Sequence, residues 1–475
     1  GILRYNQTGG VAIIGTDDAP ENNRGVLEIL NAGSEFNLTD GQLIIARAQN
    51  NPSIASLYLD PGSSSIDADG KILMGYSSTP SNETMGIYSI VDIPYLKIDN
   101  SSGQMPTMKQ WVVPLTVTDS LVIEAGAEHN ADGRDLYIGG DILVNGTFTP
   151  GGNTTYMNGA AQQEITGNST FYNLTKSTAT TLALNDDVTV NNVFSMPSGT
   201  LVDNDNTFSV KGNINFGGTH TWGGSGNGIA LNGGSEQIMS GAGTYGLLSI
   251  NNPDGVSIDP GSGSGITITN ELQLNEGIFD IDKYLLLLQT DANVTTTNSF
   301  DENTLIQTNI SFTDAGIKKE FLEITSTTDY EFPVGVEGKY TPVKFSIDNV
   351  DANGSIRLKA ANEMQPTITD DNDECNEFID SLNVLQYHWI LEADGINNFT
   401  ANMTMTFNPD DALTEASPSG GVAYDTADYI AARILTYGDN TWNKYDYSNF
   451  AGADNQLVFS FSGTDDNGIS GDYTA

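Results

Sequence analysis

Short bursts of alternating apolar and polar residues, separated by Asn, Asp, Gly, Ser and Thr, run along most of the chain. Within residues 174–210 the apolar positions of each burst fall two residues apart, which is the period of a β-strand. No stretch has a capped apolar stripe with the 3.6-residue period of a helix, although residues 428–434 have room for one helical turn. Parallel strands without crossover helices require the chain itself to coil. The pattern therefore predicts an all-β fold built from coils.

A strand–glycine–strand unit recurs along the chain. Gly126, Gly199 and Gly277 each follow an alternating apolar strand and lead into a second strand, and these glycines lie 73 and 78 residues apart. Self-similarity of this kind indicates stacked units that cannot bury an apolar face alone. We expect one copy to form about three turns of a parallel β-solenoid, with about 25 residues in each turn. An antiparallel sandwich array is the alternative.

The pattern changes along the chain and divides it into three expected domains. Residues 1–110 carry irregularly spaced strand–glycine units, which is typical of an end cap, whereas residues 111–300 carry the regular solenoid repeats. In residues 301–475 the strands lengthen and gain aromatic residues. This last part predicts an immunoglobulin-like β-sandwich, with Trp389 in its core.

Composition narrows the range of partners. The chain has 61 acidic and 18 basic residues, giving a formal net charge of −43. Because phosphate backbones are bound by Lys and Arg, nucleic acid is not an expected partner. The longest apolar runs fall far short of the roughly 20 residues that a membrane-spanning helix needs, so the chain is not expected to span a membrane. Cys375 is the single cysteine, which excludes an intrachain disulfide.

Candidate catalytic groups are sparse in the sequence. The histidines, His129, His220 and His388, fall in separate parts of the chain, and none has a ligand-spaced partner. A zinc site or a nucleophilic triad needs converging groups, so neither is expected. Because carboxylates are abundant, their pairing carries little information. We expect no catalytic residues and no enzyme.

A β-helix polysaccharide lyase or glycoside hydrolase is the alternative. β-Solenoids often carry such enzymes, with their acids on one exposed face. A cleft for anionic sugar needs Lys or Arg to neutralise the sugar carboxylate, and the predicted solenoid offers only scattered basic residues such as Arg134, Lys176 and Lys211. The sequence therefore favours a structural role.

Two acidic clusters are candidate calcium sites, and calcium is the one cofactor considered. Hard cations prefer several carboxylate and carbonyl oxygens on a turn, although neither cluster has the spacing of an EF-hand. A solvated acidic loop is the alternative. The candidate ligands are Asp370, Asp371 and Asp373 in the first cluster and Asp465, Asp466 and Asp472 in the second.

Two aromatic residues in polar surroundings are candidates for glycan binding. The ring face of Trp222 or Tyr245 would stack on a sugar if it were exposed. Packing in the interior is the alternative for both residues.

Several short motifs resemble a segment that is common in large surface proteins of Bacteroidota. The motifs are Phe332-Pro-Val-Gly335 with Tyr340-Thr-Pro-Val343, Trp389-Ile-Leu391, Ala432-Arg433 with Trp442, and Ser470-Gly-Asp-Tyr-Thr-Ala475. Such proteins include gliding and attachment adhesins exported by the type 9 secretion system, and they combine Gly/Asn/Thr-rich β repeats with sandwich modules. The resemblance extends loosely over most of the chain, but the C-terminus has no recognisable type 9 sorting domain.

The resemblance implies a segment of an extracellular cell-surface adhesin or filament, active in cell adhesion or gliding motility. The solenoid would act as a stiff spacer, and the sandwich would cap it or join the next module. The expected partners are surface glycans, neighbouring modules or subunits of a long fibre, and the secretion machinery during export. The start at Gly1 and the end at Ala475, both without targeting signals, are expected of a segment from a longer polypeptide.

Overall fold

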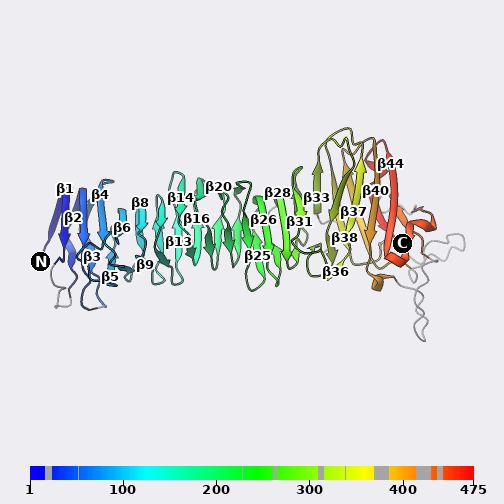
Figure 1. Cartoon of the computed structure of the whole chain (residues 1–475). Helices are drawn as coiled ribbons and strands as arrows, with labels where there is room; N and C mark the ends of the chain where they lie inside the picture. Colours follow the sequence, from blue (N-terminus) through cyan, green and yellow to red (C-terminus); the bar gives the residue numbers. More distant parts are fainter. Residues whose placement is uncertain are drawn as a thin grey trace, which may run out of the picture. The chain divides into compact units, whose positions relative to one another are not determined.

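A computed structural model of the chain is all-β (Figure 1). It describes residues 1–16, 24–51, 53–226, 228–259, 265–308, 315–336, 338–368, 384–412, 429–435 and 442–475. Within these ranges the only helices are four short 3-10 helices, η1 to η4, and no helix is long and apolar enough to cross a membrane. The chain divides into two compact units, Gly1–Asn232 (unit 1) and Gly233–Ala475 (unit 2), which are described in turn.

Unit 1 consists of short strands joined by tight corners. Its strands are β1 (Arg4–Ile14), β2 (Leu27–Ile45), β3 (Leu57–Ile66), β4 (Gly70–Met74), β5 (Thr84–Ser89), β6 (Ile93–Ile98), β7 (Thr107–Gln110), β8 (Leu115–Ile123), β9 (Glu128–Asn130), β10 (Leu136–Ile138), β11 (Ile142–Val144), β12 (Thr147–Thr149), β13 (Thr154–Met157), β14 (Gln163–Thr166), β15 (Ser169–Phe171), β16 (Asn173–Lys176), β17 (Thr181–Leu184), β18 (Val188–Val190), β19 (Phe194–Met196), β20 (Thr200–Val202), β21 (Phe208–Val210), β22 (Ile214–Phe216), β23 (Thr219–Thr221) and β24 (Ile229–Leu231).

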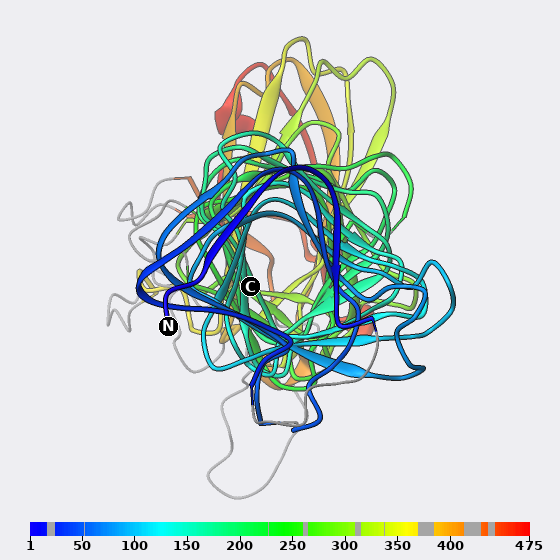
Figure 2. The same cartoon turned by 90° about the vertical axis from the view of Figure 1, so that its left-hand side faces the viewer.

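The strands of unit 1 stack as parallel ladders around a common interior, so that the chain forms a parallel β-solenoid. Figure 2 shows the coils of unit 1 end-on, with the ribbon passing repeatedly round the same closed path. The ladders are β8–β10–β13–β16–β19–β22, β8–β11–β14–β17–β20–β23 and β15–β18–β21–β24. The predicted solenoid is confirmed.

The coil is shorter than the sequence predicted. In the third ladder Ser169 pairs with Val188, 19 residues on, and Val188 pairs with Phe208, 20 residues on. The expected value of about 25 residues per turn is therefore wrong for this region. Each strand here has three or four residues, and the corners between strands are correspondingly short.

The sequence repeat does not coincide with a structural unit. Leu115 and its counterpart Val188 occupy the same place in the first two copies, yet Leu115 pairs with Leu136 in the first ladder, whereas Val188 lies in the third. Three turns of the coil lead along the first ladder from Leu115 to Leu174. The 73-residue offset between the first two sequence copies is longer than these three turns, so it includes part of a fourth turn. The copies share a strand–corner–strand pattern but begin on different faces of the coil.

Apolar side chains fill the interior of unit 1. Strands such as β18 and β21 have two buried residues flanking one half-buried residue, which is the alternation expected when one strand face is inside. Phe194 and Phe208, both fully buried, meet with their ring centroids 4.6 Å apart. Burial of one such side chain contributes about 1.5–3 kcal/mol. The stacked interior is the main source of stability in the coil.

The corners of unit 1 require special backbone conformations. Asn204 and Asp205 have φ angles of 48° and 68°, a left-handed conformation that Asn and Asp tolerate better than most residues. At Gly140 an added Cβ atom would lie 1.9 Å from the carbonyl oxygen of Asp119 in the preceding coil, so only glycine fits. These needs explain much of the Gly- and Asn-rich composition.

Unit 2 begins with further parallel coils and ends in antiparallel sheets. Its elements are β25 (Gln237–Ser240), β26 (Thr244–Asn251), β27 (Val256–Ile258), β28 (Gly265–Glu276), β29 (Phe279–Asp280), β30 (Leu285–Leu288), β31 (Asn293–Thr295), β32 (Ile306–Gln307), β33 (Gly316–Phe321), β34 (Thr328–Phe332), β35 (Val334–Val336), β36 (Lys339–Tyr340), β37 (Val343–Asp348), β38 (Gly354–Ala361), β39 (His388–Asp394), β40 (Phe399–Thr406), η1 (Pro409–Asp411), β41 (Ala432–Ile434), β42 (Trp442–Lys444), η2 (Tyr447–Asn449), β43 (Phe450–Ala451), η3 (Gly452–Asp454), β44 (Gln456–Gly463), η4 (Asp466–Gly468) and β45 (Gly471–Thr474).

One strand of unit 2 belongs to both kinds of sheet. β33 pairs in parallel with β30 of the coil on one edge and antiparallel with β38 on the other. The antiparallel sheet continues through β39, β45 and β41 to β42. A second antiparallel sheet has the order β34–β37–β40–β44–β43. The parallel ladders therefore continue beyond residue 300, through β33 and β35.

The two antiparallel sheets of unit 2 pack as a sandwich around aromatic side chains. Trp389 is fully buried, and its indole Nε1 donates a hydrogen bond to the carbonyl oxygen of Thr341 at 3.2 Å. The ring of Tyr473 in β45 meets that of Phe459 in β44 of the other sheet, with the centroids 5.1 Å apart. The predicted sandwich and the core position of Trp389 are confirmed.

Candidate functional site

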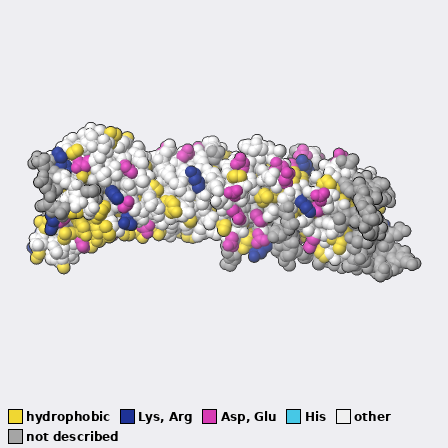
Figure 3. All heavy atoms as spheres, turned by 90° about the horizontal axis from the view of Figure 1, so that it is seen from below, with side chains coloured by type: hydrophobic (Ala, Val, Ile, Leu, Met, Phe, Trp, Pro, Cys, Tyr) yellow, Lys and Arg dark blue, Asp and Glu magenta, His cyan; other side chains and the backbone are white. Residues whose placement is uncertain are grey.

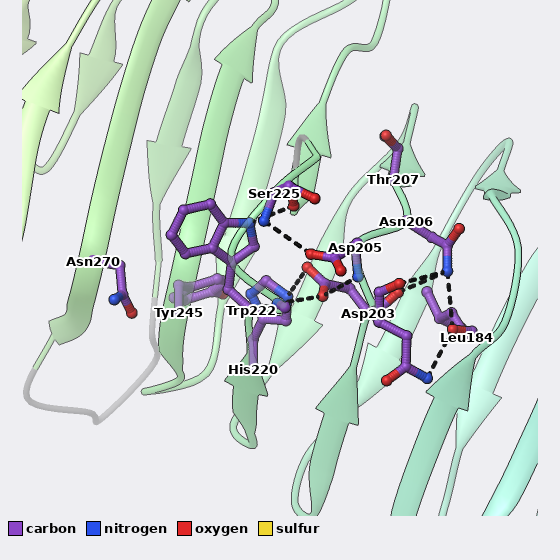
Figure 4. A network of polar contacts seen from close by, with 12 residues as sticks. Leu184, Asp203, Asp205, Asn206, Thr207, His220, Trp222, Ser225, Tyr245 and Asn270 are labelled. Atoms are coloured by element: carbon purple, nitrogen blue, oxygen red, sulfur yellow. Dashed lines mark hydrogen bonds and ion pairs between the residues drawn. The ribbon is translucent and has the colours of Figure 1, made fainter.

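The corner that follows β20 organises the surroundings of Trp222 (Figure 4). Asp203, the first residue after β20, is fully buried. Its Oδ1 accepts hydrogen bonds from the backbone N–H of Gly223 at 2.8 Å and of Asp205 at 3.2 Å. Asp203 therefore closes its own corner and holds the corner of the next coil.

Trp222 lies in that next corner and is half-buried. Its indole Nε1 donates to the carbonyl oxygen of Ser225 at 2.8 Å, and the N–H of Ser225 donates to Asp205 Oδ1 at 2.9 Å. The indole N–H is thus used within the loop. Because the indole N–H is already bonded, Trp222 can interact with a ligand only by stacking through the exposed part of its ring.

A histidine–carboxylate pair lies directly beneath this loop. His220 Nε2 is 3.1 Å from Asp203 Oδ2, and both side chains are fully buried. A group must reach its substrate in order to transfer a proton, and this pair faces the interior of the coil. We assign it a structural role, in which Asp203 satisfies one of the two ring nitrogens of His220.

The other two histidines are also interior. His129 is fully buried, its Nε2 lies 3.0 Å from Gln110 Oε1, and burial lowers its pKa to about 3. His388 Nδ1 lies 2.8 Å from the carbonyl oxygen of Glu363, and burial lowers the pKa of this ring as well. Burial therefore disfavours the charged form of both rings.

Tyr245 does not present a ring face to solvent. The residue is fully buried in β26 of unit 2, and burial raises the pKa of its hydroxyl. A buried ring cannot stack on a glycan, so the alternative of interior packing applies to Tyr245.

The second acidic cluster is divided between separate roles. Asp465 caps η4, with its side chain accepting from the N–H of Asn467 at 3.1 Å, while Asp466 Oδ1 accepts from the N–H of Ile396 at 2.7 Å. Asp472 is buried within the sandwich, where its Oδ2 accepts from Gln365 Nε2 at 2.9 Å. Burial raises the pKa of Asp472. The structure does not bring these three carboxylates together.

The first acidic cluster, Asp370, Asp371 and Asp373, lies outside the described residues. Within the described ranges, no three His, Cys, Asp or Glu side chains form a group that could hold a metal ion. A calcium site therefore stays a prediction.

A groove on the outer surface of unit 1 was missed by the sequence analysis. Lys71 in β4 pairs in register with Tyr95 in β6, and Leu73 pairs with Lys97, so that these outward side chains form a shallow floor. Tyr76, Ser77, Asp99, Ser101 and Ser102 also line the groove, whose volume is about 360 Å³. The alternation around Lys71 and Lys97 indicates outward positions, but only the register shows that they are neighbours.

No protein-family model matches this chain, and no curated protein or solved structure is significantly similar to it.

Proposed function

We propose that this chain is a segment of an extracellular cell-surface adhesin or filament, in which the β-solenoid is a stiff spacer. The sandwich closes the last coil or joins the spacer to a further module. Surface glycans, neighbouring modules of a fibre and the secretion machinery are the partners that this role requires. The resemblance of the C-terminal motifs to gliding and attachment adhesins of Bacteroidota supports the proposal.

The in-register stacking of the coils is the observation that carries this proposal. Ladders of strands run along different sides of unit 1. The hydrogen bonds of each ladder join successive coils and run along the axis of the stack. Bending the stack in any direction must therefore stretch the hydrogen bonds of the ladder on its outer side. A stack held in this way resists bending much more than strands joined by flexible linkers.

Polar groups inside unit 1 tie neighbouring coils together. The buried Lys176 Nζ donates to Gln163 Oε1 at 2.8 Å and to the carbonyl oxygen of Gly159 at 3.4 Å, both in the preceding coil. Burial lowers the pKa of Lys176 to about 8, so the amine is still mainly protonated at neutral pH. A charge-assisted hydrogen bond between coils adds to the resistance of the stack.

Stretching single molecules of the full chain would test the spacer role. The chain would be held through enzymatically ligated handles at its two ends, which avoids chemistry at Cys375. We expect a rigid response at low force, followed by cooperative rupture as the ladders break. Gradual extension at low force, like that of an unfolded chain, would overturn the proposal.

Incubation with acidic and neutral polysaccharides would separate this role from the enzyme alternative. The chain and each polysaccharide would be incubated with and without calcium, and the glycan would then be sized. Retention of the protein on intact glycan supports an adhesin. Shortened glycan would instead assign a solenoid lyase or hydrolase.

A further inference from the structure

The groove over β4 and β6 contains one ammonium group without an acidic partner. Lys71 Nζ lies 5.2 Å from the ring centroid of Tyr95, and within the described residues it forms no ion pair. Lys97, by contrast, is held by Asp99 Oδ1 at 2.8 Å and by Glu124 Oε1 at 2.5 Å. Lys71 is thus the positive group that the groove leaves available to a ligand.

The remaining groups in the groove are those that neutral sugars use. The Tyr95 ring gives an apolar face on which a sugar ring can stack. The hydroxyl of the exposed Ser102 and the amide of Gln42 can exchange hydrogen bonds with sugar hydroxyls. Gln42, Lys71 and Tyr95 stand in line on successive strands. A strand spacing of about 4.8 Å is comparable to the width of one sugar ring.

We propose that this groove binds an oligosaccharide that carries a single carboxylate on otherwise neutral sugars. The carboxylate pairs with Lys71 Nζ, and an adjacent ring stacks on Tyr95. Lys97 is already shared between two acidic partners, Asp99 and Glu124, so the ligand carboxylate is matched by Lys71 alone. This proposal adds a ligand class to the proposed surface role. It depends on that role in one respect, which is that the chain must be exposed to glycans.

The overall charge of the chain is the reason for proposing a ligand with only one carboxylate. With a formal net charge of −43, the protein repels densely charged polymers such as nucleic acids and polyuronates. A ligand with a single carboxylate is repelled less than a densely charged polymer, and its attraction to a nearby ammonium group is a larger share of its total electrostatic energy. The groove is therefore expected to discriminate between matched neutral and monoacidic sugars.

Matched pairs of sugars would test this assignment on the full chain. The probes are cellobiose with cellobiouronic acid, xylotriose with its glucuronic acid-substituted form, and lactose with 3′-sialyllactose, with binding measured by calorimetry and saturation-transfer NMR. We expect at least one acidic member to bind about tenfold more tightly than its neutral partner, which is the effect of one charge-assisted hydrogen bond. The preference should weaken as sodium chloride is raised.

Two substitutions and a control locate the effect. Lys71→Met should reduce binding of the acidic sugar to the level of its neutral partner, and Lys71→Arg should retain the preference. Lys109→Met is the control, because Lys109 also stands over an aromatic ring, that of Trp111 at 5.7 Å, but lies outside the groove and is paired with Asp132. This change alters the net charge equally and should leave binding unchanged.

Three results would overturn the proposal. They are a lack of binding by every pair, equal binding of acidic and neutral members, and a preference that survives Lys71→Met. Because the experiment measures binding alone, the spacer role can fail in the stretching experiment while the groove is upheld, and the reverse also holds.

Discussion

The coils of unit 1 and the sandwich of unit 2 bury polar groups in different ways. In the coils, interior polar contacts join residues less than one turn apart along the chain, such as Lys176 with Gln163, 13 residues apart, and His220 with Asp203, 17 residues apart. In the sandwich they join distant parts of the chain, such as Gln365 with Asp472, 107 residues apart. Damage in a coil is therefore expected to stay local, whereas damage in the sandwich should spread through the whole fold.

Removing the largest aromatic side chain of the sandwich should have the largest effect. Trp389→Ala deletes a fully buried ring and its hydrogen bond to Thr341, and we expect the free energy of unfolding of unit 2 to fall by about 3–5 kcal/mol. Hydrogen exchange should accelerate across the sandwich but not in residues 136–216. Equal acceleration in both regions would mean that the two units unfold together.

Asp203→Ala should damage a coil almost as strongly, but locally. The change leaves buried His220 and the N–H groups of Gly223 and Asp205 without their acceptor, which we expect to cost about 2–4 kcal/mol. Asp203→Asn keeps one acceptor and should cost less. Hydrogen exchange would measure both effects, and acceleration far from β20 and β23 would contradict the local character of the coil.

Acid should weaken the coil through His129. The pKa of His129 is about 3 in the folded state and about 6.5 in the unfolded chain, so the unfolded state takes up the proton first. The free energy of unfolding is therefore not reduced by this group above pH 6.5, and it decreases as the pH falls from 6.5 toward 3. At pH 5 the decrease is about 2 kcal/mol. Urea unfolding of the wild type and of His129→Gln at pH 7 and pH 5 would measure it. An unchanged pH dependence in the variant would refute this role.

A corner ladder should contribute the least. Asn192 Nδ2 donates to Asn173 Oδ1 of the preceding coil at 2.8 Å, and Asn192→Ala should cost about 0.5–1.5 kcal/mol. Asn215→Ala is the matched control, since its contact with Ser195 is 3.5 Å long. Thermal unfolding should rank Asn192→Ala below Asn215→Ala in stability, and the reverse order would argue against the ladder.

The strands could be predicted from the sequence, but the length of a coil could not. Alternation depends on one strand at a time, and the apolar positions that alternate within residues 174–210 include Phe194 and Phe208, which are buried. Coil length depends on the corners, whose conformations at residues such as Asn204 are set by contacts with the preceding coil. For this reason Leu115 and Val188 match in sequence but occupy different ladders.

The candidate sites were harder to predict because burial is decided by partners distant in the sequence. Tyr245 lies in a strand with six consecutive buried residues, so alternation gives no sign of which side is exposed. Asp472 follows a polar loop but lies in β45 between β39 and β41. Lys71 and Tyr95 become neighbours only through the register of β4 and β6.

The pairing of β33 has a consequence for aggregation. A solenoid that simply stopped would leave its last strands with free backbone N–H and C=O groups, which is a template for pairing with other chains. Here β38 covers the free edge of β33 in the opposite direction, so that a further parallel coil cannot add at that edge. The sandwich thereby protects this edge of the stack from uncontrolled growth into fibrils.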